Sequence, residues 1–440
     1  MPDELVVLTL STLTYGGDAL GRLDDPVKGT SGRAVFVPFG LPGERVRIRL
    51  TEEKRGFARG ELVEVLEASP DRVPPRCKHF FTAPVTSADS EGKSTGGGGE
   101  ACGGCQYQHM SYAAQLKAKA EILRDQLQRI GRIENPTVRP TVASPNPWNY
   151  RNHVQFHLTK NGKLGYVRAS PGANPSGSVL AIEECHLPEP SINALWPQLE
   201  FEPNTGIGRV SLRSGMDGDL MLILDSGSPD TPELEIEAGI SVVHTFEESS
   251  VVIAGADHTT LRVMGRDFRV SALSFFQVNT VMAEKIISHL LDNLPITPET
   301  NLLDVYCGVG LFSAFLAPRC KRIIGVESSP SACNDFIFNL DEFDNVDLYE
   351  GRAEDVILHL EVKPDILLVD PPRAGLERGA YEGILRLNPR SIAYVSCDPS
   401  TLARDAGRLI NGGYRLVDVT PFDLFPQTSH IESISIFEKR

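Results

Sequence analysis

The sequence predicts an α/β protein whose last part is a doubly wound domain, preceded by a small β-barrel and a β-rich central unit. Short β-type runs separated by glycine- or proline-bearing turns fill residues 1–67 and return over 137–265. From residue 266 onward, wholly apolar runs alternate with helical segments, which is typical of a parallel sheet covered on both faces. A length of 440 residues also favours three domains at roughly 150 residues each.

Composition excludes several classes of protein. Apolar residues make up 41% and charged residues 23%, which excludes disordered and collagen-like chains. The aliphatic runs, such as 220–224, have the length of strands, whereas a membrane span needs roughly 20 apolar residues. Asp3 and Glu4 precede Val6 where an export signal would carry basic residues, so we expect a cytoplasmic protein without a membrane segment. The net charge of -15 argues against indiscriminate polyanion binding, but a local basic face would still allow RNA binding.

Residues 1–67 predict a small antiparallel barrel, because β-type runs at 6–10, 34–37, 46–50 and 62–66 alternate with turns. Strict alternation over 45–50 places Arg45, Arg47 and Arg49 on one face of a strand. This row of arginines is either a phosphate-contacting stripe or a solvated barrel face. The pattern alone favours neither interpretation.

The central unit spans residues 68–265. Residues 82–100 hold one sizeable aliphatic residue, Val85, and end in four glycines and a glutamate, which predicts a flexible loop insertion. Apolar residues then recur at helical spacing, which predicts an amphipathic helix over 111–132 that ends near Gly131. We expect this helix to pack on the domain that follows.

The doubly wound domain spans residues 266–440, with strands predicted at 302–305, 323–326, 366–369 and 392–395. The first strand leads into a glycine-bearing turn, Asp304 to Gly310, and the second ends at Glu327, which is placed to hydrogen-bond ribose hydroxyls. The dinucleotide-binding motif has a third glycine at the position where this chain has Ser313. Because Asp304 would repel phosphate, the turn better suits a ligand with a cationic amino-acid end, such as S-adenosylmethionine.

Two further motifs lie at the predicted carboxyl edge of this sheet. Asp370-Pro371-Pro372-Arg373 is similar to the motif of amino-methyltransferases, although those enzymes carry an aromatic residue in the fourth position. Cys397 ends the last clear strand just before a predicted helix, where helix-terminal N–H groups can lower a thiol pKa. Cys397 is therefore a candidate nucleophile.

The other cysteines separate into two groups. Cys307, Cys320 and Cys333 are interpreted as small buried hydrophobes. Without an export signal, disulfides are not expected, so clustered cysteines favour metal ligation. Cys102 and Cys105 show the C-x-x-C spacing that serves both zinc and iron–sulfur sites, and spacing alone leaves both open.

Six motifs, in order along the chain, resemble the RNA 5-methyluridine methyltransferase family. They are residues 274–279 (SFFQVN), the turn 304–310, Glu327, residues 370–373 (DPPR), residues 396–399 (SCDP) and residues 430–432 (HIE). The barrel region is also similar to the TRAM domain that precedes many members, with Gly16-Gly17, Val35-Phe36-Val37 and Pro42-Gly43-Glu44 in the expected places. The resemblance covers nearly the whole chain.

The resemblance implies a covalent mechanism of methylation at carbon 5 of uridine. Cys397 would add to carbon 6 of the base, and Glu432 would act as general base, although an acid in a strand-like run often just faces solvent. By the same resemblance Gln277, Tyr306, Glu327 and Asp370 bind S-adenosylmethionine. The target base must leave its stack to reach the cysteine.

The resemblance also implies a [4Fe-4S] cluster held by Cys77, Cys102, Cys105 and Cys185, with the insertion 82–100 as a departure between the first two ligands. The RNA substrate is ribosomal RNA or tRNA, and the barrel with a cluster favours ribosomal RNA. We expect a monomer. In the segment Tyr150 to His153, Arg151 is interpreted either as an RNA contact or as a packing residue.

Two other functions remain open on the sequence. An amino-methyltransferase acting through residues 370–373 would not need Cys397. A non-catalytic RNA-binding protein with a degenerate transferase fold would transfer no methyl group.

Overall fold

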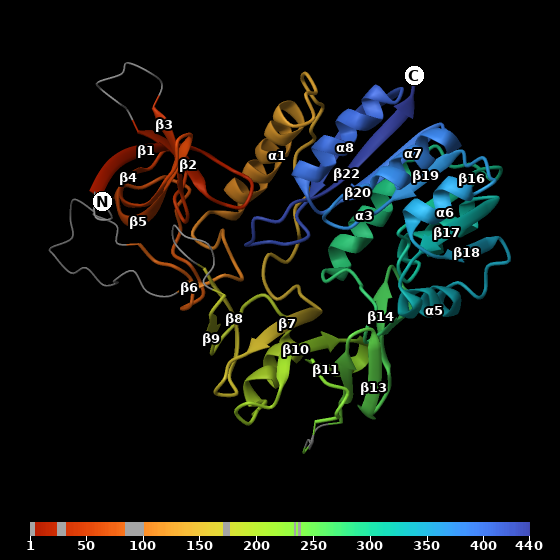
Figure 1. Cartoon of the computed structure of the whole chain (residues 1–440), viewed down its shortest axis with the longest axis horizontal. Helices are drawn as coiled ribbons and strands as arrows, with labels where there is room; N and C mark the ends of the chain where they lie inside the picture. The colour runs from red at the N-terminus through yellow and green to blue at the C-terminus, as the bar shows by residue number, and fades with distance from the viewer. Residues whose placement is uncertain (1–4, 24–31, 84–100, 170–176, 233–234, 236–238) are drawn as a thin grey trace.

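The computed structural model describes residues 5–23, 32–83, 101–169, 177–232, 235 and 239–440. Figure 1 shows the red barrel at one side of the molecule, the large blue and teal sheet at the other, and the central strands between and below them. Most of the expected loop insertion, residues 84–100, lies outside the described residues.

Five strands form a closed barrel in the order β1-β2-β3-β5-β4. They are β1 Leu5–Leu13, β2 Ala19–Leu23, β3 Arg33–Val37, β4 Arg45–Glu53 and β5 Phe57–Glu67. Every second side chain, including Val35, Val46 and Ile48, points into a fully buried interior. The predicted barrel is confirmed, but the expectation of a wholly antiparallel one is wrong, since β3 and β5 pair in parallel. A closed ring with an odd number of strands cannot alternate direction throughout, so one neighbouring pair must be parallel.

The arginine row of β4 is matched by a row of glutamates on β5. The pairs are Arg45 with Glu67 (3.1 Å), Arg47 with Glu64, and Arg49 with Glu61 (2.9 Å). The antiparallel register brings these side chains across from one another on the outer face of the barrel. This face is balanced in charge, which favours the solvated-face interpretation over a phosphate-contacting stripe.

A second sheet forms the central unit, in the order β13-β12-β11-β10-β7-β8-β6 with β9 paired to β8. Its strands are β6 Ala101–Cys102, β7 His153–Leu158, β8 Leu164–Ala169, β9 Val179–Ala181, β10 Ile207–Ser214, β11 Leu220–Ser226, β12 Ser241–Phe246 and β13 Ser249–Ala254. The short helix α2, Pro190–Leu195, and the turn Trp196–Gln198 cover the apolar face. The predicted β-rich character of this region is observed.

A hairpin of β14, His258–Val263, and β15, Arg266–Ser271, leads into the last domain. Val263 and Phe268 are fully buried in the core of that domain. The boundary that we expected between residues 265 and 266 therefore falls in the turn of this hairpin, because both of its strands need the same core to bury their apolar faces.

Seven strands make up the sheet of the last domain, in the order β18-β17-β16-β19-β20-β22-β21. They are β16 Asn301–Val305, β17 Arg322–Glu327, β18 Val346–Glu350, β19 Ile366–Val369, β20 Ser391–Ser396, β21 Tyr414–Phe422 and β22 Glu432–Lys439. The first five in the sheet order run parallel, whereas β22 is antiparallel to both of its neighbours.

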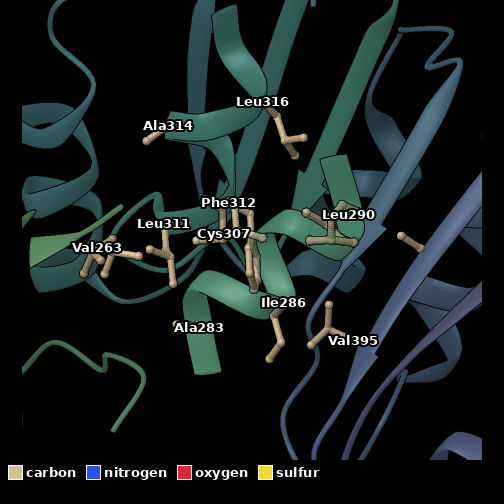
Figure 2. Packing of buried hydrophobic residues seen from close by; sticks show 14 of the residues in the cluster. Val263, Ala283, Ile286, Leu290, Cys307, Leu311, Phe312, Ala314, Leu316 and Val395 are labelled. Carbon is tan, nitrogen blue, oxygen red and sulfur yellow. The ribbon is translucent and has the colours of Figure 1, made fainter. Parts of the chain in front are cut away.

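Helices cover both faces of this sheet. Leu302 packs in the core with α3 Thr280–Asn293, α4 Leu311–Leu316 and α5 Pro330–Asn339, and Figure 2 shows part of that packing around Ile286, Cys307 and Phe312. Leu303, on the opposite face, packs with α6 Ala353–His359, α7 Arg378–Leu387 and α8 Pro399–Asn411. The predicted doubly wound α/β fold is confirmed, and the strand order reverses between β16 and β19.

Helix α1, Tyr112–Arg129, begins at Ser111, whose side chain accepts a hydrogen bond from the amide of Ala114. It belongs to the central part of the sequence but lies against α8, as Figure 1 shows. Lys119 Nζ lies 2.6 Å from Asp423 Oδ1, and both side chains are fully buried. This ion pair joins α1 to the segment that connects the last two strands.

Candidate active site

The candidate residues of the last domain gather at the carboxyl edge of its sheet. Asp304, Glu327, Asp370 and Cys397 lie at or just after the ends of β16, β17, β19 and β20. Glu432 opens the antiparallel strand β22, next to the end of β20, because Ser433 pairs with Ser396. In open α/β sheets, ligands bind at this edge, where the strand order reverses.

The turn after β16 is built from left-handed residues. Tyr306 (φ 65°), Gly308 (φ 55°) and Gly310 (φ 87°) all have positive φ. Glu327 holds the turn, since its carboxylate accepts hydrogen bonds from the amide of Gly308 at 3.0 Å and from that of Ser329 at 2.8 Å. The predicted ribose-binding acid is thus fixed in place at this turn.

Asp304 is fully buried below the turn. One carboxylate oxygen accepts a hydrogen bond from Ser313 Oγ at 2.6 Å, and the other is buried and has no partner among the residues that the structure describes. Burial raises the pKa of Asp304 to about 7, although the Ser313 hydrogen bond opposes the shift. Ser313 therefore anchors the acid at the place where a dinucleotide site would carry glycine.

Asp370 lies close to Asp304 across β16 and β19, and its amide donates to the carbonyl of Val305 at 3.2 Å. Burial, followed by the charge of Asp304, raises the pKa of Asp370 to about 7. Two neighbouring acids with raised pKa values favour a cationic ligand, since it would restore the ionised form of both.

Cys397 is half-buried, and its surroundings are acidic. Burial, followed by Glu432 and Asp370, raises the pKa of its thiol to about 12, and Arg373 opposes the shift. The expectation that the helix terminus lowers this pKa is wrong. Asp398 takes up the helix amides instead, with Oδ1 accepting from Ser400 N at 2.9 Å and Thr401 N at 3.0 Å.

Glu432 is buried, with 3% of its surface exposed, and does not face solvent as an acid in such a strand often does. Burial and the nearby Asp370 raise its pKa well above the usual value, and Arg373 opposes the shift. A carboxyl with a raised pKa is a stronger base once ionised. The structure thus places the predicted nucleophile and the predicted base beside each other.

Gln277 does not lie at the end of a sheet strand but in the segment before α3. Its backbone carbonyl accepts a hydrogen bond from Asn152 Nδ2 at 2.9 Å, and Asn279 caps α3 two residues later. Within the described residues, its side chain makes no hydrogen bond to Asp304, Glu327 or Asp370. The structure places the other five candidates at the same edge of the sheet, namely Tyr306, Glu327, Asp370, Cys397 and Glu432. The roles of all six stay predictions.

Sequence reasoning missed two residues near Cys397. Arg373 opposes the rise in the pKa values of Cys397 and Glu432. From the sequence alone, we treat it only as a departure from an amino-methylation motif. Tyr15 of the barrel donates a hydrogen bond to Asp398 at 2.6 Å. The two residues are 383 positions apart, so no sequence signal joins them.

Four cysteines line one cavity of about 210 Å³: Cys77, Cys102, Cys105 and Cys185. Cys102 N donates to the carbonyl of His79 at 2.8 Å, so the segments on either side of the insertion meet here. Burial raises the pKa of Cys77 to about 11 and that of Cys102 to about 12. Within the part of the chain that the structure describes, no three His, Cys, Asp or Glu side chains are arranged around a single metal ion.

Four sulfur donors around one cavity are the donor set of a [4Fe-4S] cluster. The guanidinium of Arg151 faces the same cavity, stacks on Phe425 (5.6 Å) and has a buried Nε without a partner. A half-buried guanidinium at the wall of the cavity favours an anionic group there, and a thiolate-bound iron–sulfur cluster is anionic. The four cysteines thus supply the donors that the predicted cluster needs, and the cluster itself stays a prediction.

Comparison with known proteins identifies the class. Residues 4–63 match the TRAM domain model, and residues 240–440 match the model described as tRNA (uracil-5-)-methyltransferase. An uncharacterized RNA methyltransferase of Halalkalibacterium halodurans is 32% identical over 99% of this chain and 97% of its own length. Another, of Thermosynechococcus vestitus, is 32% identical over 98% of this chain and 97% of its own.

Among solved structures, the Pyrococcus abyssi tRNA (uracil-54, C5)-methyltransferase in complex with S-adenosyl-L-homocysteine has the same fold. It matches with a TM-score of 0.69 and 22% identity, over 98% of this chain and all of that chain. These matches define an RNA methyltransferase. The chain belongs to the tRNA (uracil-5-)-methyltransferase family and carries an N-terminal TRAM domain, as the resemblance implied.

Helices long and apolar enough to cross a membrane are not found among the residues described.

Proposed function

We propose that the protein methylates carbon 5 of a uridine in RNA through a covalent adduct with Cys397. The observation that carries the proposal is the position of Cys397 beside Glu432 and Asp370, at the ligand-binding edge of the sheet. An unactivated pyrimidine carbon is a poor nucleophile, and a transient covalent bond divides one difficult step into two easier ones.

The proposed reaction begins when the Cys397 thiol loses its proton to water, and the thiolate forms a bond from Sγ to carbon 6 of uridine. The electron pair of the C5=C6 bond moves to the C4 carbonyl as an enolate, and carbon 5 then takes the methyl group. Glu432 removes the proton from carbon 5. The C–H electron pair re-forms the C5=C6 bond and expels Cys397 as a thiolate.

S-adenosylmethionine supplies the methyl group as an electrophile when it is bound, and S-adenosylhomocysteine leaves. We propose that Gln277, Tyr306, Glu327 and Asp370 hold it. Two acids beside a left-handed turn support this: Asp304 is fully buried and Asp370 is half-buried. One carboxylate oxygen of Asp304 has no hydrogen-bond partner among the described residues. A sulfonium and an amino group provide the cations that such acids favour.

The test is methyl transfer from labelled S-adenosylmethionine, with the product nucleoside identified by mass spectrometry. Cys397→Ala is expected to abolish transfer and to leave S-adenosylmethionine binding largely intact. Cys320→Ala, a matched change at a buried cysteine away from the site, should retain activity. Transfer by Cys397→Ala at the wild-type rate would refute the covalent mechanism.

We propose ribosomal RNA as the substrate, supported by the TRAM barrel together with a four-cysteine cavity. Unmodified ribosomal RNA and tRNA are tested in separate reactions. 5-Methyluridine in ribosomal RNA alone supports the proposal, and 5-methyluridine in tRNA alone refutes this choice of substrate. A methylated amino group in the product would instead identify an amino-methyltransferase. If no methyl group were transferred to either RNA, the result would favour a non-catalytic RNA-binding protein.

We also propose that Cys77, Cys102, Cys105 and Cys185 hold a [4Fe-4S] cluster. Protein purified without oxygen is expected to contain about four iron atoms and about four sulfides per chain. One zinc per chain in place of iron and sulfide would contradict the proposal. Cys102→Ser should lower the iron content, whereas Cys333→Ser should not.

A further inference from the structure

The loop between β1 and β2 of the barrel reaches the edge of the sheet that carries Cys397. The hydroxyl of Tyr15 donates to Asp398 Oδ2 at 2.6 Å. Asp398 follows Cys397 directly and caps α8, because its other oxygen, Oδ1, accepts from the amides of Ser400 and Thr401. One carboxylate thus joins the barrel, the nucleophile segment and the start of α8.

The shape of this loop is fixed on both sides. Within it, Thr14 N donates to the carbonyl of Asp18 at 2.8 Å, and Gly17 N donates to that of Thr14 at 3.1 Å. Gly17 has φ 102°, and a Cβ there would lie 3.1 Å from Gln106 and 3.4 Å from Ser429. A side chain at this position would crowd Gln106, and the left-handed backbone would strain any residue other than glycine.

The contacts of the loop surround the proposed catalytic pair. Ser429 precedes Glu432 by three residues, and its amide donates to Gln106 Oε1 at 3.1 Å. The loop thus contacts the segment before Glu432 through Gly17 and the segment after Cys397 through Tyr15.

The Tyr15 hydrogen bond matters because it acts on a carboxylate in the charged surroundings of Cys397. The groups that face the thiol are Glu432 from β22, Asp370 and Arg373 from the segment after β19, and Asp398 beside it. When all three carboxyls are ionised, they outnumber the one guanidinium and disfavour a thiolate at Cys397. Burial works to raise the pKa of Asp398, but hydrogen bonds from Ser400, Tyr15 and Thr401 outweigh it and hold this pKa below its usual value.

We propose that Tyr15 is a positioning residue for methyl transfer, through which the barrel fixes the Cys397–Asp398 segment and the start of α8. The barrel is then a structural part of the active site as well as a domain beside it. The inference rests on the proposed role of Cys397 as nucleophile.

The experiment compares full-length Tyr15→Phe with wild type. Tyr381→Phe is the matched control, because its hydroxyl donates to the carbonyl of Arg408 at 3.0 Å, farther along α8. The rate of adduct formation is measured in single turnovers with RNA that carries 5-fluorouridine, at saturating S-adenosylmethionine and from about pH 6 to 9. In this adduct, fluorine replaces the proton that Glu432 would remove, so the covalent complex accumulates.

Loss of one hydrogen bond to a charged group is expected to lower the rate for Tyr15→Phe about tenfold. The pH profile of its rate should move to higher pH. Without the Tyr15 hydroxyl, the negative charge of Asp398 is less well stabilised and disfavours the Cys397 thiolate more strongly. The KM for RNA and for S-adenosylmethionine should stay unchanged. Tyr381→Phe should stay within about twofold of wild type.

A double-mutant cycle with Asp398→Asn tests whether Tyr15 acts through Asp398. In the Asp398→Asn background, Tyr15→Phe should change the rate of adduct formation much less. A wild-type rate and pH profile for Tyr15→Phe would overturn the inference, as would an equal loss in Tyr381→Phe. A higher KM for RNA at an unchanged rate would show that Tyr15 only binds substrate. Adduct formation by Cys397→Ala would instead refute the proposed mechanism, whatever Tyr15 does.

Discussion

A thiol with a pKa of about 12 is almost entirely protonated at neutral pH, so Cys397 in the free protein is held in its unreactive form. Its acidic neighbours produce this effect together with burial. A cationic ligand beside Asp370 would offset their charge and favour the thiolate. The site is thus expected to become reactive only when the methyl donor is in place, which protects the cysteine from other electrophiles.

S-adenosylmethionine affinity should fall at acid pH. Asp304 and Asp370 have pKa values of about 7 in the free protein, and a bound cation requires their ionised forms. Below about pH 7, up to two protons compete with the ligand, so the Kd should rise by up to about a hundredfold per pH unit, and above about pH 8 this dependence should vanish. Calorimetric titration measures it. Asp304→Asn should weaken binding at pH 8 and flatten the curve, and a steep curve in this variant would contradict the assignment.

Glu432→Gln should trap the reaction after methyl transfer. Without a base, carbon 5 keeps its proton and Cys397 cannot be expelled, so a methylated protein–RNA adduct should accumulate. Denaturing gels with labelled methyl groups detect it. Glu438→Gln, at an exposed glutamate of the same strand paired with Arg415, serves as the control and should turn over normally. Normal turnover by Glu432→Gln would exclude it as the base.

At the scale of the element, α1 is held to the last domain by a buried charge pair as well as by apolar contacts. Lys119→Ala would leave the buried Asp423 without its cation, and the free energy of unfolding should fall by about 3–5 kcal/mol. Urea denaturation measures the change. Lys117→Ala removes an exposed partner of Glu121 one turn away and should cost at most about 0.5 kcal/mol. Equal effects of the two would show that the buried pair contributes little.

Elements with a clear pattern were predictable. The runs 302–305, 323–326, 366–369 and 392–395 are apolar throughout because the sheet is covered on both faces, and each is a strand. By contrast, β18 was missed. It lies at the edge of the sheet, and its residues Asp347, Tyr349 and Glu350 are exposed, so no apolar run marks it.

The candidate site was predictable only in part. Strand ends could be read from the sequence, and parallel strands bring their carboxyl ends to one edge, so Asp304, Glu327 and Cys397 could be placed together. The pKa of Cys397 could not be predicted. It depends on burial and on the combined charge of Glu432 and Asp370, which only the assembled fold defines.

At the scale of the whole molecule, the barrel's arginine row contributes little free positive charge. Arg47→Ala is therefore expected to change RNA affinity less than about threefold and to leave the salt dependence of binding unchanged between about 50 and 200 mM. Binding assays at several salt concentrations measure both. A loss of one unit in the salt slope would show that Arg47 contacts a phosphate despite its pairing with Glu64.

The hydrogen bond between Tyr15 and Asp398 also has a consequence for the order in which the chain is made. At roughly 5–20 residues per second, the ribosome releases the barrel well before it has synthesised residue 398. The barrel can therefore fold before the surface around Asp398 exists. A chain interrupted before the last strands would contain a complete barrel but no assembled catalytic edge. Under the proposed mechanism, such fragments could not form the Cys397 adduct with RNA.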